Sequence, residues 1–308
     1  MKTLALFSFI VCLSSSNCLG QGTKINNPFF KEQNFFSSSF EAQNFNQLVG
    51  QKTSDPGLFF SSFEQEASKT QYAMLQKTIR EEVSYLVQRR VKNNLRFLRK
   101  IFEHIHKAHL KKYRTYSTFG QLWNNKIFDC LTGTALYAMI FDEMGIRYDL
   151  FETANHSYLI VRLGKERVLF ESTDPINGFI TETAEIETTQ QRYAKDIPLD
   201  FDNLLGMVGY KRTTVNTIKV YSESITLLQL SGLYYYNQAV VYYNLKKYRA
   251  AVNTLEKAFT LHPSKRILNL LLVAVQEVLK EENLQKSDLK KHIAKTRFYS
   301  TQGHGFFD

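Results

Sequence analysis

The 308-residue sequence has few cysteines, few prolines and no long hydrophobic run, and each shortage excludes a class of protein. Three cysteines, at positions 12, 18 and 130, are too few for a disulfide-rich scaffold. Five prolines and 14 glycines exclude a collagen-like or linker-dominated chain. No stretch reaches the ~18 uninterrupted apolar residues of a membrane-spanning helix, so we expect no transmembrane segment.

Acidic residues are also scarce relative to basic ones, at 29 against 39, which gives a formal net charge of +10. Such a charge favours anionic partners in general and says little about the fold. Because there is no run of five basic residues and no nucleic-acid-binding motif, we expect no nucleic-acid partner. Binding to a cell-wall polymer or a lipid surface through this charge stays open. With 44% hydrophobic residues, the chain can fold into two modest domains.

The N-terminus has the pattern of a secretory signal. One lysine precedes an apolar core at 4–13, which is too short to cross a bilayer, and small residues follow it. We therefore expect residues 1–20 to be a signal peptide, cleaved after Gly20 or after Ser16. The mature protein would be exported to the periplasm or the extracellular space. A lipoprotein anchored through Cys18 is less favoured, because the three residues before it fit a lipidation box poorly.

Composition and periodicity divide the rest of the chain. Apolar residues recur every three or four positions over 68–112, which predicts one long helix or two that are broken near Asn93. Residues 181–216 show no clear pattern. The expected organisation is a signal peptide at 1–20, a Phe/Asn/Ser-rich linker or pro-segment at 21–66, an N-terminal helical region at 67–116, a mixed domain at 117–216, a helical region at 217–297 and a tail at 298–308.

One helical stretch contains Glu103, His106 and His109 on a shared face, which raises the question of a metal site. The HExxH motif is absent and Lys107 lies alongside, so we expect an exposed polar face and no metal. No motif for a cofactor is present, and we expect none.

The central part predicts an α+β fold with a helix and an antiparallel sheet. An apolar helix at 131–144 ends at Gly145, and strands are expected at 147–153, 157–163 and 167–172.

Cys130 stands at the start of this helix, where Asp129 can cap the first turn. A thiol at a helix N-terminus feels the positive end of the dipole, which favours the thiolate, and the free N–H groups can stabilise an oxyanion. The alternative is that Cys130 is a small buried hydrophobic residue, as free cysteines often are.

The hairpin between the second and third strands determines which carboxylate faces His156. If residues 164–166 form a three-residue loop, paired positions sum to 330 and His156 lies opposite Asp174, with Cβ atoms about 5 Å apart. A two-residue turn would place His156 opposite Thr173 instead. In the first register, Cys130, His156 and Asp174 form a set of nucleophile, base and orienting carboxylate.

Residues 129–178, which include DCLTGTALYAM, ANHSYL and FESTDP, resemble the transglutaminase-like superfamily. This family has a papain-like core with a Cys-His-Asp triad in this order. The resemblance implies that Cys130 is the nucleophile, His156 the base and Asp174 the orienting residue. It implies a cysteine hydrolase, such as a peptidase or amidase, or an acyl transferase, which acts on an amide or peptide bond of a peptide or protein substrate. Gln121 and Trp123 are candidates for the family's group near the oxyanion.

Residues 234–263 match the spacing of a tetratricopeptide repeat, which some bacterial transglutaminase-like proteins carry C-terminally. Such a repeat stacks on neighbouring helices, and we expect these at 222–230 and 267–279. An alternative function is therefore a non-catalytic transglutaminase-like and tetratricopeptide scaffold that binds a protein partner. The matching positions are Tyr235, Ala239, Tyr242, Tyr248, Ala251, Leu255, Ala258 and Pro263.

Overall fold

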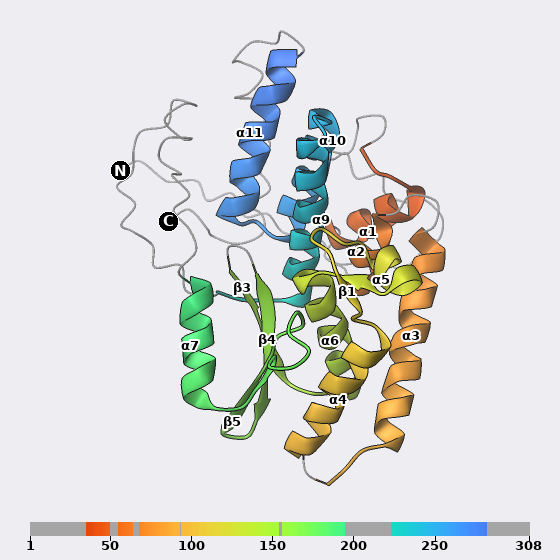
Figure 1. The fold of residues 1–308 in the computed structure, drawn as a ribbon. Coiled ribbons are helices and arrows are strands. Elements are labelled where there is room, and N and C mark those ends of the chain that lie inside the picture. Colours follow the sequence, from red (N-terminus) through yellow and green to blue (C-terminus); the bar gives the residue numbers. More distant parts are fainter. Residues whose placement is uncertain are drawn as a thin grey trace, which may run out of the picture.

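The computed structural model describes residues 35–49, 55–63, 68–92, 94–153, 156–194 and 223–281. Helices surround one face of a five-stranded antiparallel sheet, and a single helix covers the other face (Figure 1). The expected α+β class is confirmed at this level. The expected signal peptide and C-terminal tail lie outside the described residues.

The sheet has the strand order β6-β5-β4-β3-β7, and all neighbours are antiparallel. The three central strands were predicted from alternation, whereas the two short edge strands were not. The strands are β3 (Tyr148–Glu152), β4 (Ser157–Leu163), β5 (Glu166–Phe170), β6 (Phe179–Ile180) and β7 (Glu223–Ile225).

The two faces of the sheet contact different helices. Side chains such as Leu159 and Phe170 join the main core together with α6 (Cys130–Met144). On the other face, Tyr158 and Ile160 form a separate small core with Ile186 of α7 (Thr183–Ala194). The expectation that 181–216 is irregular is therefore wrong for α7, whose apolar pattern is weak because Ile186 is its one fully buried apolar residue.

The predicted central helix is present as α6. Asp129 caps its first turn, and Gly145 ends it in a left-handed conformation with φ 66°. The helix packs on β4 and on two long helices, α3 (Ser68–Gln88) and α9 (Leu227–Asn244). These contacts cover α6 on all sides, which agrees with its apolar residues lying all round the helix.

The 68–112 region forms two helices, α3 and α4 (Asn94–Ala108), which is one of the two alternatives expected.

The expectation that the histidines lie on an exposed face is wrong: His106 and His109 are both buried. His106 Nε2 lies 3.0 Å from the carbonyl oxygen of Ser172, and His109 Nε2 lies 2.6 Å from Glu82 Oε1. Hydrogen bonds therefore hold His106 to the segment after β5 and His109 to α3. Burial lowers the pKa of His106. The described residues contain no cluster of three or more side chains suited to a metal ion.

The described part of the Phe-rich segment belongs to the core, which corrects the linker interpretation for 35–49 and 55–63. It forms α1 (Ser39–Val49) and α2 (Pro56–Ser62). Phe45 and Phe59 are fully buried, and the Phe45 ring packs edge-on against Tyr235 of α9 with a centroid distance of 5.7 Å. These contacts depend on residues far along the chain, so no local period marked them.

The C-terminal region contains α9, α10 (Tyr248–Leu261) and α11 (Lys265–Glu281). A Cβ on Gly232 in α9 would lie 2.6 Å from the Cβ of His262, so the start of α9 contacts the end of α10 and the pair is antiparallel. Ala239 and Ala258 are fully buried, as expected for a close helix pair. The separate helix expected at 222–230 is wrong, because β7 occupies its first described residues and Thr226 caps α9 directly.

A short parallel pair lies beside the start of α6. It joins β1 (Lys112–Tyr113) to β2 (Ile127–Phe128), with α5 (Phe119–Asn125) between them in the chain. This pair fixes the 111–117 segment next to the residues that lead into Cys130. Among the described helices, none has the length and apolarity needed to cross a membrane.

Candidate active site

Cys130 is the first residue of α6 and is half-buried. The buried Asp129 holds this helix end in place: its Oδ1 accepts from the Thr132 N–H at 2.8 Å, and its Oδ2 accepts from the Ser117 N–H at 3.1 Å. Burial raises the pKa of Asp129 to about 6, although these hydrogen bonds oppose the effect. The cap therefore ties the nucleophile position to the loop that follows β1.

The first turn of α6 has few free donors. The N–H groups of Leu131 and Thr132 donate to the Asp129 carboxylate, and the N–H of Gly133 donates to the Asp129 carbonyl at 3.0 Å. The N–H of Cys130 is the donor of this turn that remains for an oxyanion beside the sulfur. The helix end therefore offers one free N–H group to an oxyanion, rather than the several that we expected.

Gly133 lets the helix end approach β5 closely. A Cβ at this position would lie 2.8 Å from both Cβ and Oγ of Ser172, closer than real Cβ contacts. The Ser172 hydroxyl also donates to the Cys130 carbonyl at 3.2 Å. This close approach brings the end of β5, where Glu171 lies, next to Cys130.

His156 directly precedes β4, and Thr153 holds its backbone. The His156 N–H donates to Thr153 Oγ1 at 3.1 Å, and the Thr153 N–H donates to the His156 carbonyl at 2.9 Å. The imidazole lies close enough to the Cys130 thiol to interact with it, and its Nε2 bonds the Glu171 carboxylate. Burial lowers the pKa of His156, but the bonds to Cys130 and Glu171 outweigh this and raise it to about 10.

Glu171 is buried and its two oxygens have several donors. Oε1 accepts from the Thr173 N–H at 2.9 Å and from the Thr173 hydroxyl at 2.7 Å, while Oε2 accepts from the Tyr193 hydroxyl at 2.6 Å. Burial alone would raise the pKa of Glu171, but the bonds from His156, Tyr193 and Thr173 lower it. The Tyr193 ring also lies against the His156 imidazole, at a centroid distance of 4.5 Å. The carboxylate is therefore ionised and fixed.

The structure brings together Cys130 and His156 but not His156 and Asp174. Asp174 Oδ1 accepts from the N–H groups of Ile176 at 3.0 Å and Asn177 at 2.8 Å, so this carboxylate stabilises the turn after β5. The carboxylate on the imidazole is Glu171, which sequence reasoning missed.

The three-residue hairpin loop is wrong, and the alternative two-residue turn is the one present, with Gly164 at its first central position and a φ of 60° that favours glycine. Leu163 pairs with Glu166, so the loop has two residues and paired positions sum to 163 + 166 = 329. The continued register places His156 opposite Thr173, and Glu171 is then the diagonal neighbour on the same face. Diagonal neighbours are ~7–8 Å apart, within reach of a glutamate side chain. A search for carboxylates at diagonal positions would have found Glu171.

The two candidates for a group near the oxyanion have structural roles. The Gln121 side chain accepts from the Thr118 N–H at 3.1 Å and completes the capping box of α5. Trp123 is buried, with its ring 5.8 Å from Phe119 and 6.0 Å from His109.

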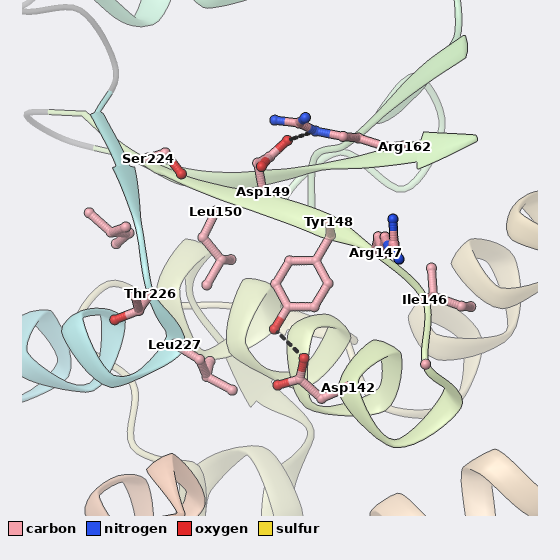
Figure 2. A pocket seen from close by; sticks show the side chains of 12 residues that line it. Asp142, Ile146, Arg147, Tyr148, Asp149, Leu150, Arg162, Ser224, Thr226 and Leu227 are labelled. Carbon is pink, nitrogen blue, oxygen red and sulfur yellow. Dashed lines mark hydrogen bonds and ion pairs between the residues drawn. The ribbon is translucent and has the colours of Figure 1, made fainter. Parts of the chain in front are cut away.

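A hollow of about 620 Å³ lies between the end of α6, β3 and β7 (Figure 2). It lies at the Tyr148 end of β3, whereas His156 lies near the Glu152 end of the same strand. Polar side chains that line it bond one another: the Tyr148 hydroxyl donates to Asp142 at 2.8 Å, and Arg162 bonds Asp149. The hollow is therefore separate from the Cys130 site.

Comparison of the chain with protein-family models, curated proteins and solved structures finds no match in any of the three. The geometry of Cys130, His156 and Glu171 is therefore the basis for a functional proposal.

Proposed function

We propose that the protein is an exported cysteine hydrolase or acyl transferase that acts on an amide or peptide bond. Cys130 is the nucleophile, His156 transfers the proton, and Glu171 is the positioning carboxylate. The observation that carries this proposal is the position of the His156 imidazole, which interacts with the Cys130 thiol on one side and hydrogen-bonds the Glu171 carboxylate on the other. A nucleophile beside a base that a third group orients is the arrangement of covalent acyl-transfer enzymes.

The proposed reaction begins with attack of the Cys130 sulfur on the substrate carbonyl. The positive imidazolium of His156 stabilises the anionic sulfur before attack. The carbonyl oxygen becomes negative and accepts a hydrogen bond from the Cys130 N–H. His156 then donates its proton to the leaving amine, and a thioester forms on Cys130. Water or a second amine, deprotonated by His156, attacks the thioester and releases the product and the thiolate.

Glu171 has two effects on this cycle. Its bond to Nε2 fixes the orientation of the imidazole, so the other ring nitrogen faces the sulfur. Its negative charge stabilises the imidazolium, which raises the pKa of His156 to about 10 together with Cys130. The hydroxyl and N–H donors around Glu171 hold its own position, and a fixed carboxylate can orient the base without reorganisation.

The resemblance to the transglutaminase-like superfamily supports the same proposal. The thiol precedes the imidazole and the carboxylate in the chain, the thiol starts a helix, and the other two groups lie on adjacent strands or at their ends. We propose a papain-like core on this basis, with a glutamate in place of the family's aspartate.

A non-catalytic scaffold has less support. A tetratricopeptide-like unit would bind a partner along its helices, but α1 and α2 cover part of α9 with the chain's own aromatic side chains. In addition, Glu152 of β3 bonds both His262, at 2.6 Å, and Arg266. The C-terminal helices therefore support the sheet beside His156, and a partner for their remaining surface stays a proposal.

Alkylation of Cys130 tests the proposed function. The folded full-length protein is treated with iodoacetamide near neutral pH, and the modified peptide is quantified by mass spectrometry, which separates Cys130 from the other two cysteines. We expect rapid modification of Cys130 and a large decrease in its rate in His156→Gln. If Cys130 reacts only after unfolding, it is a buried structural thiol and the proposal is wrong.

A further inference from the structure

The segment 111–116, with the sequence KKYRTY, is exposed along its whole length. We call it the cationic rim. Tyr113 retains 50% and Tyr116 40% of their accessible surface, which is unusual for large aromatic side chains in this structure. Three of its six residues are basic, namely Lys111, Lys112 and Arg114.

Backbone hydrogen bonds place the cationic rim next to Cys130. Tyr113 pairs with Phe128 in the β1–β2 ladder, and the Arg114 N–H donates to the Phe128 carbonyl at 2.8 Å. Phe128 lies two residues before Cys130. The next residue after the rim, Ser117, donates its N–H to the Asp129 carboxylate, which caps the Cys130 helix. The rim is thus held against both residues that precede the nucleophile.

A contact with α9 also fixes the backbone conformation of the cationic rim. Tyr116 has φ 59°, a left-handed conformation that bulky residues rarely adopt. The Gln238 side chain of α9 donates to the Tyr116 carbonyl at 3.3 Å. Strained backbone persists where surrounding contacts impose it, and it is common at binding and active sites.

The charges of the cationic rim are available for a ligand. Between Glu103 and Asp129 the sequence contains no acidic residue. Among the described residues, no carboxylate forms an ion pair with the three basic side chains of the rim. The nearby carboxylates of Asp129 and Glu171 are buried and hydrogen-bonded, and that of Asp174 is used in its own turn.

We infer that the cationic rim selects substrates with carboxylate groups close to the reactive carbonyl, such as acidic peptide segments. The inference rests on the proposed function of Cys130. Positive charges beside a nucleophile attract an anionic substrate and raise its local concentration. The exposed tyrosine rings provide contact area for the same segment, because aromatic side chains lose little conformational freedom on binding.

Two alkylating reagents that differ in charge test the inference. Iodoacetate is anionic and iodoacetamide is neutral, so the ratio of their rates at Cys130 measures attraction of a carboxylate. The test variant is Lys111→Gln/Lys112→Gln/Arg114→Gln. The control is Arg90→Gln/Lys92→Gln/Lys100→Gln, which removes the same charge from the segment before α4 and from the first half of that helix; Lys100 is about 12 Å along the helix from its end at Ala108. All six side chains are exposed, and circular dichroism checks that both variants fold.

We expect the iodoacetate-to-iodoacetamide ratio to fall on the order of three- to tenfold in the rim variant at low salt, because the variant removes three positive charges near the nucleophile. The control should keep the wild-type ratio, and 1 M NaCl should remove the difference. If the ratio is unchanged in the rim variant, or falls equally in the control, the inference is wrong and the proposed function is unaffected. If wild-type Cys130 reacts slowly with both reagents, the proposed function is wrong and the inference falls with it.

Discussion

The buried ion pair between Glu41 and Lys257 gives a direct test of how the N-terminal segment is integrated. Glu41 is completely buried and the Lys257 side chain is only 4% exposed, with Nζ 3.0 and 3.1 Å from the two carboxylate oxygens. The Tyr235 hydroxyl and the Ser37 N–H also donate to Glu41, at 2.8 and 2.6 Å. The pair thus connects α1 to α9 and α10 across 216 positions of the chain.

Glu41→Gln keeps the size of the side chain and removes its charge, which leaves Lys257 buried without a counter-ion. Loss of one partner of a buried pair costs about 3–5 kcal/mol. This loss has an upper limit, because Lys257 can release its proton when it has no counter-ion. Burial already lowers its pKa from 10.5, and deprotonating it at pH 7 costs at most about 5 kcal/mol. We therefore expect Glu41→Gln to lose about 3–5 kcal/mol of unfolding free energy at pH 7.

The assay is urea unfolding followed by circular dichroism. The control variant Glu81→Gln breaks an exposed pair with Lys77, whose side chains are 64% and 72% exposed, and should cost less than about 1 kcal/mol. The double variant Glu41→Gln/Lys257→Met removes both charges and should recover most of the loss. If Glu41→Gln is as stable as the Glu81→Gln control, the segment is not held in the core as the structure shows.

Two further predictions concern the helix pair and the active-site histidine. Gly232→Ala should destabilise the protein by ~1–3 kcal/mol in thermal unfolding, because its Cβ would lie 2.6 Å from that of His262; wild-type stability would contradict the close packing of α9 on α10. The pKa of His156 rises from 6.5 to about 10 on folding, so its stabilising effect is complete below pH 6.5 and is lost towards pH 10. The difference in unfolding free energy between the wild type and His156→Gln should therefore shrink across this range; an equal difference at pH 6 and pH 10 would refute it.

Local patterns in the sequence predicted the elements that hold the site. The apolar run of α6, its cap at Asp129 and its end at Gly145 depend only on neighbouring residues. The same holds for the alternation in β4 that locates His156. The helix start and the strand start then made Cys130 and His156 candidate site residues, and the structure places the two side chains close together.

The orienting carboxylate could not be read from a strand register alone. One residue fewer in the hairpin loop shifts every pair, and the Glu171 contact is diagonal. The N-terminal helices were not predicted for another reason: their aromatic residues become buried through tertiary contacts with α3, α5 and α9. Long-range pairs such as Glu41 with Lys257 have no local signature in the sequence.

The most direct test of the central claim compares the two carboxylates as partners of His156. The rate constant for iodoacetamide alkylation of Cys130 at pH 7 is measured in the wild type, Glu171→Gln and Asp174→Asn. Loss of the Glu171 charge should lower the pKa of His156, weaken the imidazolium beside the sulfur and slow alkylation on the order of tenfold or more. Asp174→Asn should stay within about twofold of the wild type, because Asp174 bonds only its own turn. Slow alkylation in Asp174→Asn with a normal rate in Glu171→Gln would contradict the account.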